Sequence, residues 1–138
     1  MSNNTKPENL HKALKEYLED YLEDIEEDVQ VSTDTVIKEA KEELVQTSPR
    51  SGLARNTKYY KGWAIKNGGR TRKGRYYSKV IWNKTNYQLT HLLENGHHTR
   101  DGTGWVEAQP HIGKVQEKYG AEFSDLLKQK IKRRSKWH

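Results

Sequence analysis

The longest regular pattern in the chain is an apolar stripe within residues 7–46. Its apolar side chains recur at intervals of three and four residues: Leu10, Leu14, Tyr17, Leu18, Tyr21, Leu22, Ile25, Val29, Val36, Ile37, Ala40, Leu44 and Val45. This spacing places them on one face of an α-helix. Val36 follows Val29 by seven residues, so the polar segment 32–34 does not break the phase of the stripe. We therefore predict one long helix, with a kink at 32–34 or a second helix capped by Asp34 as the alternatives.

A helix of this length is unusual in a small protein. About 40 residues of α-helix span about 60 Å, which is about twice the width of a small domain. The face opposite the stripe is dense with Glu and Asp. We expect such a helix either to bend or to extend past the rest of the chain and pack on a neighbour.

Two strands are predicted in the middle of the chain, over residues 59–66 and 76–83. Both segments are rich in aromatic and β-branched residues, as strands are. The loop between them carries four cations: Arg70, Arg72, Lys73 and Arg75. The two strands would form an extended β-hairpin with a basic tip. A further strand from residues 105–106, or from around Leu53, is expected to join the same sheet.

The C-terminal half predicts two helices joined by a loop. Residues 86–95 form a short apolar-faced helix, with Asn86 as its N-cap and Gly96 as its left-handed C-cap. Residues 97–109 are polar and glycine-containing, which indicates an exposed, flexible loop. Residues 112–132 form the last helix. Its stripe consists of Ile112, Val115, Tyr119, Phe123, Leu126, Leu127 and Ile131.

The predicted fold class is α+β. It comprises a long N-terminal helix, a small mostly antiparallel sheet with the extended basic hairpin, a short helix, and a C-terminal helix packed on the sheet. With 138 residues, we expect a single domain. Within it, residues 1–46 would be an acidic helical arm and residues 47–138 a basic body.

The charge of the chain is divided between these two parts. Residues 1–46 contain 13 acids and 5 bases, a net charge of −8, whereas residues 47–138 contain 6 acids and 20 bases, a net charge of +14. No Asp or Glu occurs between Thr47 and Leu93. Either the two parts face each other, within one chain or between subunits, or the basic face meets an acidic partner or DNA. The sequence leaves both interpretations open.

Composition limits the other classes of protein. Apolar residues make up 32% of the chain, and its mean hydropathy is −1.15. Such a chain fits a protein whose remaining apolar surface is buried against partner subunits, or one with solvated extensions. It has no cysteine, which excludes disulfides and thiolate metal sites. We see no signal peptide and no run near the roughly 18 apolar residues that a membrane span needs.

Several histidines raise the question of a metal site. The candidate ligands lie close together in sequence: His91, Glu94, His97, His98 and His111. A His-rich loop is also weakly similar to HNH-type nucleases, which use a metal ion and a general-base histidine. There is no H-E-x-x-H motif, no nucleophilic-serine motif and no phosphate-binding glycine loop. We therefore predict no catalytic residue, no metal and no cofactor, with histidines in packing, capping or interface roles.

Nucleic-acid binding is a further possibility for the basic hairpin. Its cations could follow phosphates, and the flanking Tyr76, Tyr77 and Trp82 could stack on bases. Core packing in the strands explains the same aromatic residues. The hairpin therefore favours no one partner by itself.

Residues 86–112 carry a resemblance to a known family. The matching residues are Tyr87, Leu92, Leu93, Glu94, Gly96, His97, Arg100, Gly102, Ala108, Pro110, His111 and Ile112. They follow a pattern of a Tyr, a Leu–Glu–x–Gly–His segment, a Gly-rich loop with an Arg, and an Ala–x–Pro–His–Ile segment. With Ser48-Pro49, Gly52 and Lys61-Gly62-Trp63 upstream, the chain resembles the head–tail joining, or tail completion, proteins of long-tailed phages, also called minor tail components.

The resemblance implies a structural virion protein and no enzyme. Six subunits would form a ring between the head connector and the tail tube, at the neck of the virion, after assembly in the host cytoplasm. The partners would be the protein itself, the connector, the tail tube and, transiently, DNA in the channel, with no membrane. Our candidate contact residues are Arg70, Arg72, Lys73, Arg75, His97, His98, Arg100 and Trp105. The alternatives are an HNH-like nuclease assisting DNA packaging and a free nucleic-acid-binding module.

Overall fold

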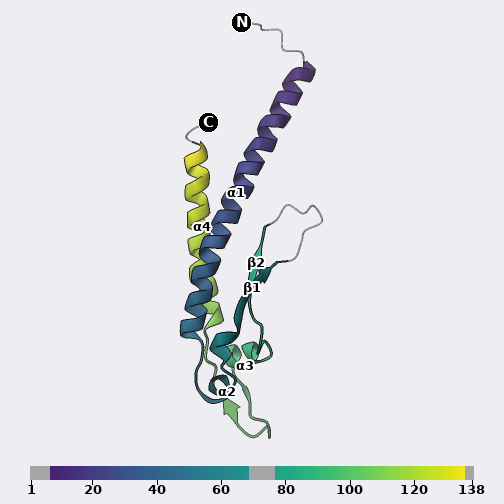
Figure 1. Cartoon of the computed structure of the whole chain (residues 1–138). Helices are drawn as coiled ribbons and strands as arrows, with labels where there is room; N and C mark the ends of the chain where they lie inside the picture. Colours follow the sequence, from purple (N-terminus) through teal and green to yellow (C-terminus); the bar gives the residue numbers. More distant parts are fainter. Residues whose placement is uncertain (1–6, 69–76, 136–138) are drawn as a thin grey trace.

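The computed structural model of the chain describes residues 7–68 and 77–135 (Figure 1). Its longest element is α1 (Pro7–Thr47), a single helix of 41 residues, which confirms the prediction of one long helix. No Gly or Pro occurs between residues 8 and 47 to interrupt it. The polar segment 32–34 also stays helical, and directly after it the Thr35 hydroxyl donates to the Val31 carbonyl at 2.8 Å.

The C-terminal helix, α4 (Ile112–Ser135), lies alongside the C-terminal half of α1 (Figure 1). The α+β class is confirmed, but we expected α4 on the sheet, and its main neighbour is α1. The strands of the hairpin are too short to cover the whole length of α4, whereas α1 is long enough. The 24 residues of α4 extend for about 36 Å, whereas each five-residue strand of the hairpin extends for about 17 Å.

Ion pairs join the acidic side of α1 to basic residues of α4. Arg134 donates to both carboxylate oxygens of Asp28, at 2.6 and 2.9 Å. Further along the two helices, Lys118 donates to Glu43 at 2.8 Å. Part of the opposite charge of the two halves is therefore paired within one chain.

The hairpin consists of β1 (Trp63–Asn67) and β2 (Lys79–Asn83), which pair antiparallel in the register Trp63 with Asn83. Both strands are shorter than predicted. The 3₁₀-helix η1 (Tyr59–Gly62) replaces the start of the first strand, because Lys58 adopts a left-handed φ of 52° and turns the chain. The predicted cations Arg70, Arg72, Lys73 and Arg75 lie outside the described residues.

Neither expected third strand joins the hairpin. Leu53 lies in the short helix α2 (Gly52–Asn56). Residues 105–106 form β4 (Trp105–Val106), which pairs with β3 (His97–His98) in a separate two-stranded ribbon. The 97–109 segment is thus a ribbon with a turn rather than a plain loop.

The short helix α3 (Leu89–Asn95) begins three residues later than predicted. Asn86 is not its N-cap, since the Asn86 side chain donates instead to the Thr57 carbonyl at 3.2 Å. Gly96 does follow the end of the helix, as predicted, but its φ of 78° and ψ of 169° lie outside the left-handed helical region that was expected.

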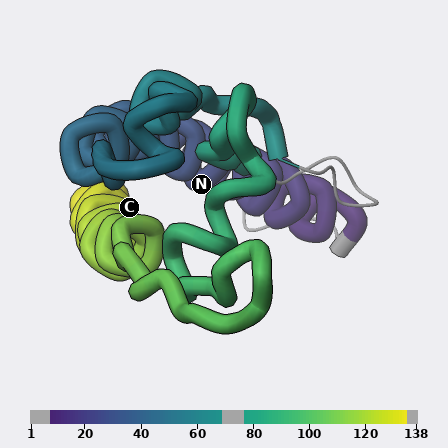
Figure 2. The backbone as a smooth tube through the Cα atoms, turned by 90° about the horizontal axis from the view of Figure 1, so that it is seen from below, coloured from purple at the N-terminus to yellow at the C-terminus, as the bar shows by residue number. Residues whose placement is uncertain are grey.

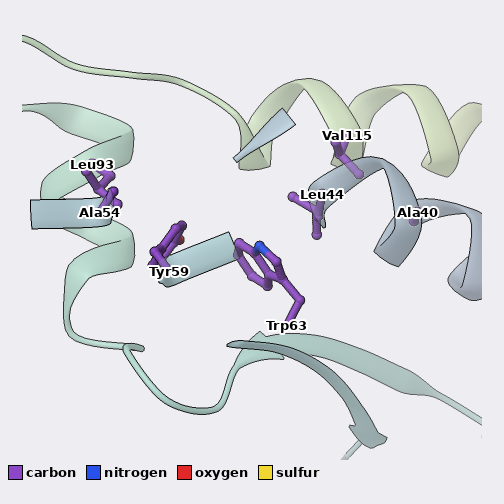
Figure 3. Close-up of a cluster of buried hydrophobic side chains, with 7 residues drawn as sticks. All are labelled: Ala40, Leu44, Ala54, Tyr59, Trp63, Leu93 and Val115. Atoms are coloured by element: carbon purple, nitrogen blue, oxygen red, sulfur yellow. The ribbon is translucent and has the colours of Figure 1, made fainter. Parts of the chain in front are cut away.

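The hydrophobic core lies at one end of the long helix (Figure 3). It comprises Ala40, Leu44, Ala54, Tyr59, Trp63, Leu93 and Val115. The rings of Tyr59 and Trp63 meet edge to face with centroids 5.5 Å apart. The Trp63 indole nitrogen donates to the Ser48 hydroxyl at 2.6 Å, and that hydroxyl donates to the Leu44 carbonyl. This core fixes the hairpin and α4 against the C-terminal half of α1.

Candidate interaction surfaces

The junction between α3 and α4 depends on one carboxylate. Glu94 Oε2 accepts from the backbone amides of His111 and Ile112 at 2.8 and 2.9 Å, and Oε1 accepts from Gly113 at 2.9 Å. The first amides of a helix have no partner inside it, and a negative charge is favourable there. Partial burial alone would raise the pKa of Glu94, but the three amide hydrogen bonds outweigh it, so the pKa lies below its ordinary value.

His111 lies buried beneath this junction. Its Nε2 is 3.0 Å from the Tyr59 hydroxyl, and its Nδ1 is 2.8 Å from the Gln109 carbonyl. A proton on Nδ1 can be donated to the Gln109 carbonyl, with Glu94 Oε2 also 3.2 Å away, and Nε2 can then accept from the Tyr59 hydroxyl. Burial, and then the charge of Glu94, raises the pKa of Tyr59. His111 is therefore a buried packing residue, which is one of the roles predicted for the histidines.

Gly96 lets the ribbon approach α3 closely. A Cβ at this position would lie 2.8 Å from the Val106 carbonyl oxygen, closer than real Cβ atoms come. Pro110 lies two residues before α4, outside the helix, where its missing amide hydrogen breaks no helical hydrogen bond. Two further motif residues, Tyr87 and Leu92, are exposed, so they are accessible to a partner.

The turn of the ribbon is ordered by Asp101. Its Oδ1 accepts from the Thr99 hydroxyl at 2.6 Å, and from the Thr103 amide and hydroxyl at 3.0 and 2.8 Å. These hydrogen bonds, first that of Thr99, lower the pKa of Asp101 to about 2. The segment predicted to be a flexible loop is thus a hydrogen-bonded turn.

The ribbon presents an aromatic pair to solvent. The ring of His98 packs edge-on against Trp105 with centroids 4.9 Å apart, and Trp105 is 52% exposed. Arg100 is exposed near the turn, whereas His97 is half-buried, with Nδ1 3.4 Å from the Leu92 carbonyl. Of the eight predicted contact residues, the structure brings His97, His98, Arg100 and Trp105 together on this ribbon.

An apolar groove of about 710 Å³ lies between α1, the hairpin and α4. Figure 2 views the backbone from below, with α4 beside the C-terminal half of α1. The walls of the groove include Val36 and Ile37 of α1, Val80 and Trp82 of β2, and Tyr119 and Phe123 of α4. The sequence analysis did not predict this groove. The apolar residues on both faces of β2 are the part of the sequence pattern that bears on it, because Val80, Ile81 and Trp82 all line the groove.

The N-terminal part of α1 extends past the end of α4 (Figure 1). We call residues 7–23 the overhang, because Arg134 near the end of α4 pairs with residues 24–28 of α1. Four leucines of the overhang, spaced four residues apart, are 47–55% exposed: Leu10, Leu14, Leu18 and Leu22. The long helix therefore takes the second of the two predicted forms, extending past the rest of the chain.

Two negative findings apply to the described part of the chain, residues 7–68 and 77–135. No group of three His, Asp or Glu residues is placed there to hold a metal ion. No helix there is long and apolar enough to cross a membrane.

The fold and these surfaces define a small α+β protein built on one long helix, with exposed surfaces at both ends. Residues 12–96 match the family model described as "Bacteriophage HK97-gp10, putative tail-component". This match covers more than half of the chain, and the protein belongs to this family of phage tail components. No curated protein and no solved structure matches the chain.

Family membership confirms the resemblance at the level of a phage tail component. The matched segment includes Tyr87, Leu92, Glu94 and Gly96 and ends one residue before His97. A tail component is a structural protein of the virion that interacts with other virion proteins, which points to a non-enzymatic role.

Proposed function

We propose that this protein joins or completes the head–tail interface of a long-tailed phage, as one subunit of a six-membered ring between the head connector and the tail tube. The observation that carries the proposal is the arrangement of surfaces in a tail-component family member. The overhang and the β3–β4 ribbon lie at opposite ends of the molecule (Figure 1). A ring subunit at this interface needs separate surfaces, because it must contact the next copy of itself and also the rings that it joins.

The ribbon is the proposed contact with a neighbouring ring. The exposed Trp105, packed edge-on against His98, supplies a large contact area. Aromatic residues and Arg are enriched in protein interfaces. The hairpin cations Arg70, Arg72, Lys73 and Arg75 would contact an acidic partner surface, or the phosphates of DNA in the channel. In this proposal residues 1–138 act as a single domain.

The first experiment is electron microscopy of lysates from a phage that lacks this gene. We expect DNA-filled heads beside separate, finished tails. Filled heads with absent tails or tails of uncontrolled length would place the protein on the tail side of the same interface. Empty heads would favour a packaging nuclease, and normal infectious particles would overturn the proposal. The wild-type gene supplied on a plasmid is the control.

The same complementation assay tests the ribbon. Truncating a tryptophan at the centre of an interface typically costs about 2 kcal/mol or more, about 30-fold in affinity. Trp105→Ala should therefore lower the titre while the purified variant keeps its thermal stability. Val31→Ala, at a similarly exposed position of α1, is the matched control. Equal titres for the two variants would contradict a contact at Trp105.

A further inference from the structure

We propose that the overhang of each subunit docks into the apolar groove of the next subunit. This inference deepens the proposed function, and rests on it, since it names the contact that links the copies of the ring. Within residues 7–68 and 77–135, the groove and the overhang are large apolar features that the packing of one chain leaves exposed.

The dimensions of the two parts agree. On α1 the groove is bordered by residues from Thr33 to Leu44, and on α4 by residues from Ile112 to Phe123. Twelve helical residues extend for about 18 Å, whereas the 17 residues of the overhang extend for about 25 Å. The groove can therefore accept about three turns of a helix. A helix that lays its apolar face into such a groove is a common mode of protein recognition.

The overhang cannot reach the groove of its own molecule. Both belong to the same uninterrupted helix, with Leu22 and Thr33 separated by about 16 Å of its axis. Folding back would require a break and a reversal, and no Gly or Pro lies between them. An overhang that fills the groove must therefore come from another molecule.

Charge favours a second copy of this chain as that molecule. The overhang has five acids and two Lys residues, a net charge of −3. The groove-bearing hairpin belongs to the acid-free stretch from residue 47 to 93, and its β1 and β2 strands present Lys66 and Lys79. A donor surface and a different acceptor surface on each copy make a head-to-tail contact, the kind of contact that closes rings.

The test uses the absence of cysteine from the natural chain. Val80 of the groove is 41% exposed, so Val80→Cys should fold. Val80→Cys is combined in turn with Leu10→Cys, Leu14→Cys, Leu18→Cys or Leu22→Cys, and phages lacking the gene are complemented with each variant. Purified virions are then treated with a bismaleimide whose flexible spacer tolerates small differences in register.

A ladder of covalent multimers of this protein on a denaturing gel is the expected result. The pair Val80→Cys with Val31→Cys, and each single variant, should give no ladder beyond a dimer. No ladder from any overhang pair, in infectious virions that contain the protein, would overturn the inference while the proposed function stands. A Val80→Cys product with a different virion protein would also overturn it. Virions that lack the protein altogether would instead overturn the proposed function.

Discussion

At the scale of single residues, the motif positions share a structural task. Glu94 holds three amides at the start of α4, Gly96 admits the ribbon, and His111 fills the space above Tyr59. These residues fix the angle at which the ribbon leaves the core. Sequence analysis singled out the same positions but could not assign the role of Glu94, because Glu94 and the amides that it binds lie 17 or more residues apart.

Replacing Glu94 by Gln should destabilise the protein. The amide keeps one acceptor but loses the second acceptor and the charge at the helix N-terminus, which together cost about 1–2 kcal/mol. Urea unfolding at pH 7 measures the difference. Glu117→Gln, at an exposed position of α4, is the control and should change stability little. Equal losses for both variants would show that Glu94 is not a cap.

The turn of the ribbon should resist acid. The pKa of Asp101 is about 2 in the folded turn, below the value of about 3.9 in an unfolded chain. Its ionised form therefore stabilises the turn above about pH 4, and this stabilisation is lost as the pH falls from about 4 towards 2. The NMR shift of the Thr103 amide should titrate near pH 2. In Asp101→Asn this titration should be absent, and a midpoint near pH 4 in the natural chain would contradict the hydrogen-bonded turn.

At the scale of elements, α4 is held to α1 at both ends of their contact. Val115 packs in the core at one end, and Arg134 pairs with Asp24, Glu27 and Asp28 at the other. Asp28 is buried, so it depends on the guanidinium as its partner. We call the ion pairs of Arg134 with Asp24, Glu27 and Asp28 the clasp. The clasp therefore determines how far along α1 the two helices stay in contact.

Removing this clasp should loosen the last turns of α4. Arg134→Met keeps most of the stem but removes two charge-assisted hydrogen bonds to the buried Asp28. Hydrogen exchange should accelerate in the last turns of α4 and around Asp28, and remain slow in the core. Arg133→Met, at an exposed neighbouring position, should leave exchange unchanged. Unchanged exchange in both variants would show that the ion pair does not stabilise the last turns of α4.

The elements themselves were predictable to different degrees. Helices α1 and α4 followed from long apolar stripes, whose period survives local irregularities. The ends of the strands did not, because the left-handed Lys58 and the 3₁₀-turn after it are set by the burial of Tyr59. The ribbon was missed because two-residue strands have no periodicity to detect.

At the scale of the whole molecule, the charged and the apolar surfaces coincide: the acidic overhang carries the exposed leucines, and the apolar groove lies beside the basic hairpin. The acidic overhang lies at one end, and α4, whose last turn carries Lys132, Arg133 and Arg134, lies alongside the C-terminal half of α1 (Figure 1). The groove could not be predicted from sequence, since it is formed where three separate elements fail to close over one another. The apolar residues on both faces of β2 indicated buried surfaces there, but not their shape.

If overhang and groove join partly through charge, salt should weaken self-association of the purified protein. At about 0.5 M salt, exposed charges more than about 5 Å apart are largely screened. Sedimentation velocity at about 50 mM and about 500 mM salt should show a shift towards smaller species. Leu18→Ala should weaken association at both salt concentrations, because it removes apolar contact and no charge. Association that strengthens with salt would indicate a purely apolar contact.

The position of the core at one end of a 41-residue helix has a consequence for folding. A helix of about 17 residues is marginally stable in water without tertiary contacts. The first turns of α1 should therefore unwind and re-form continually in a free subunit, while the turns beside the core stay fixed. Ordering them on a neighbour costs conformational entropy, about 2–5 kcal/mol for segments that fold as they bind. Free subunits would then associate weakly with each other, and the ring would form where another virion ring already holds them side by side.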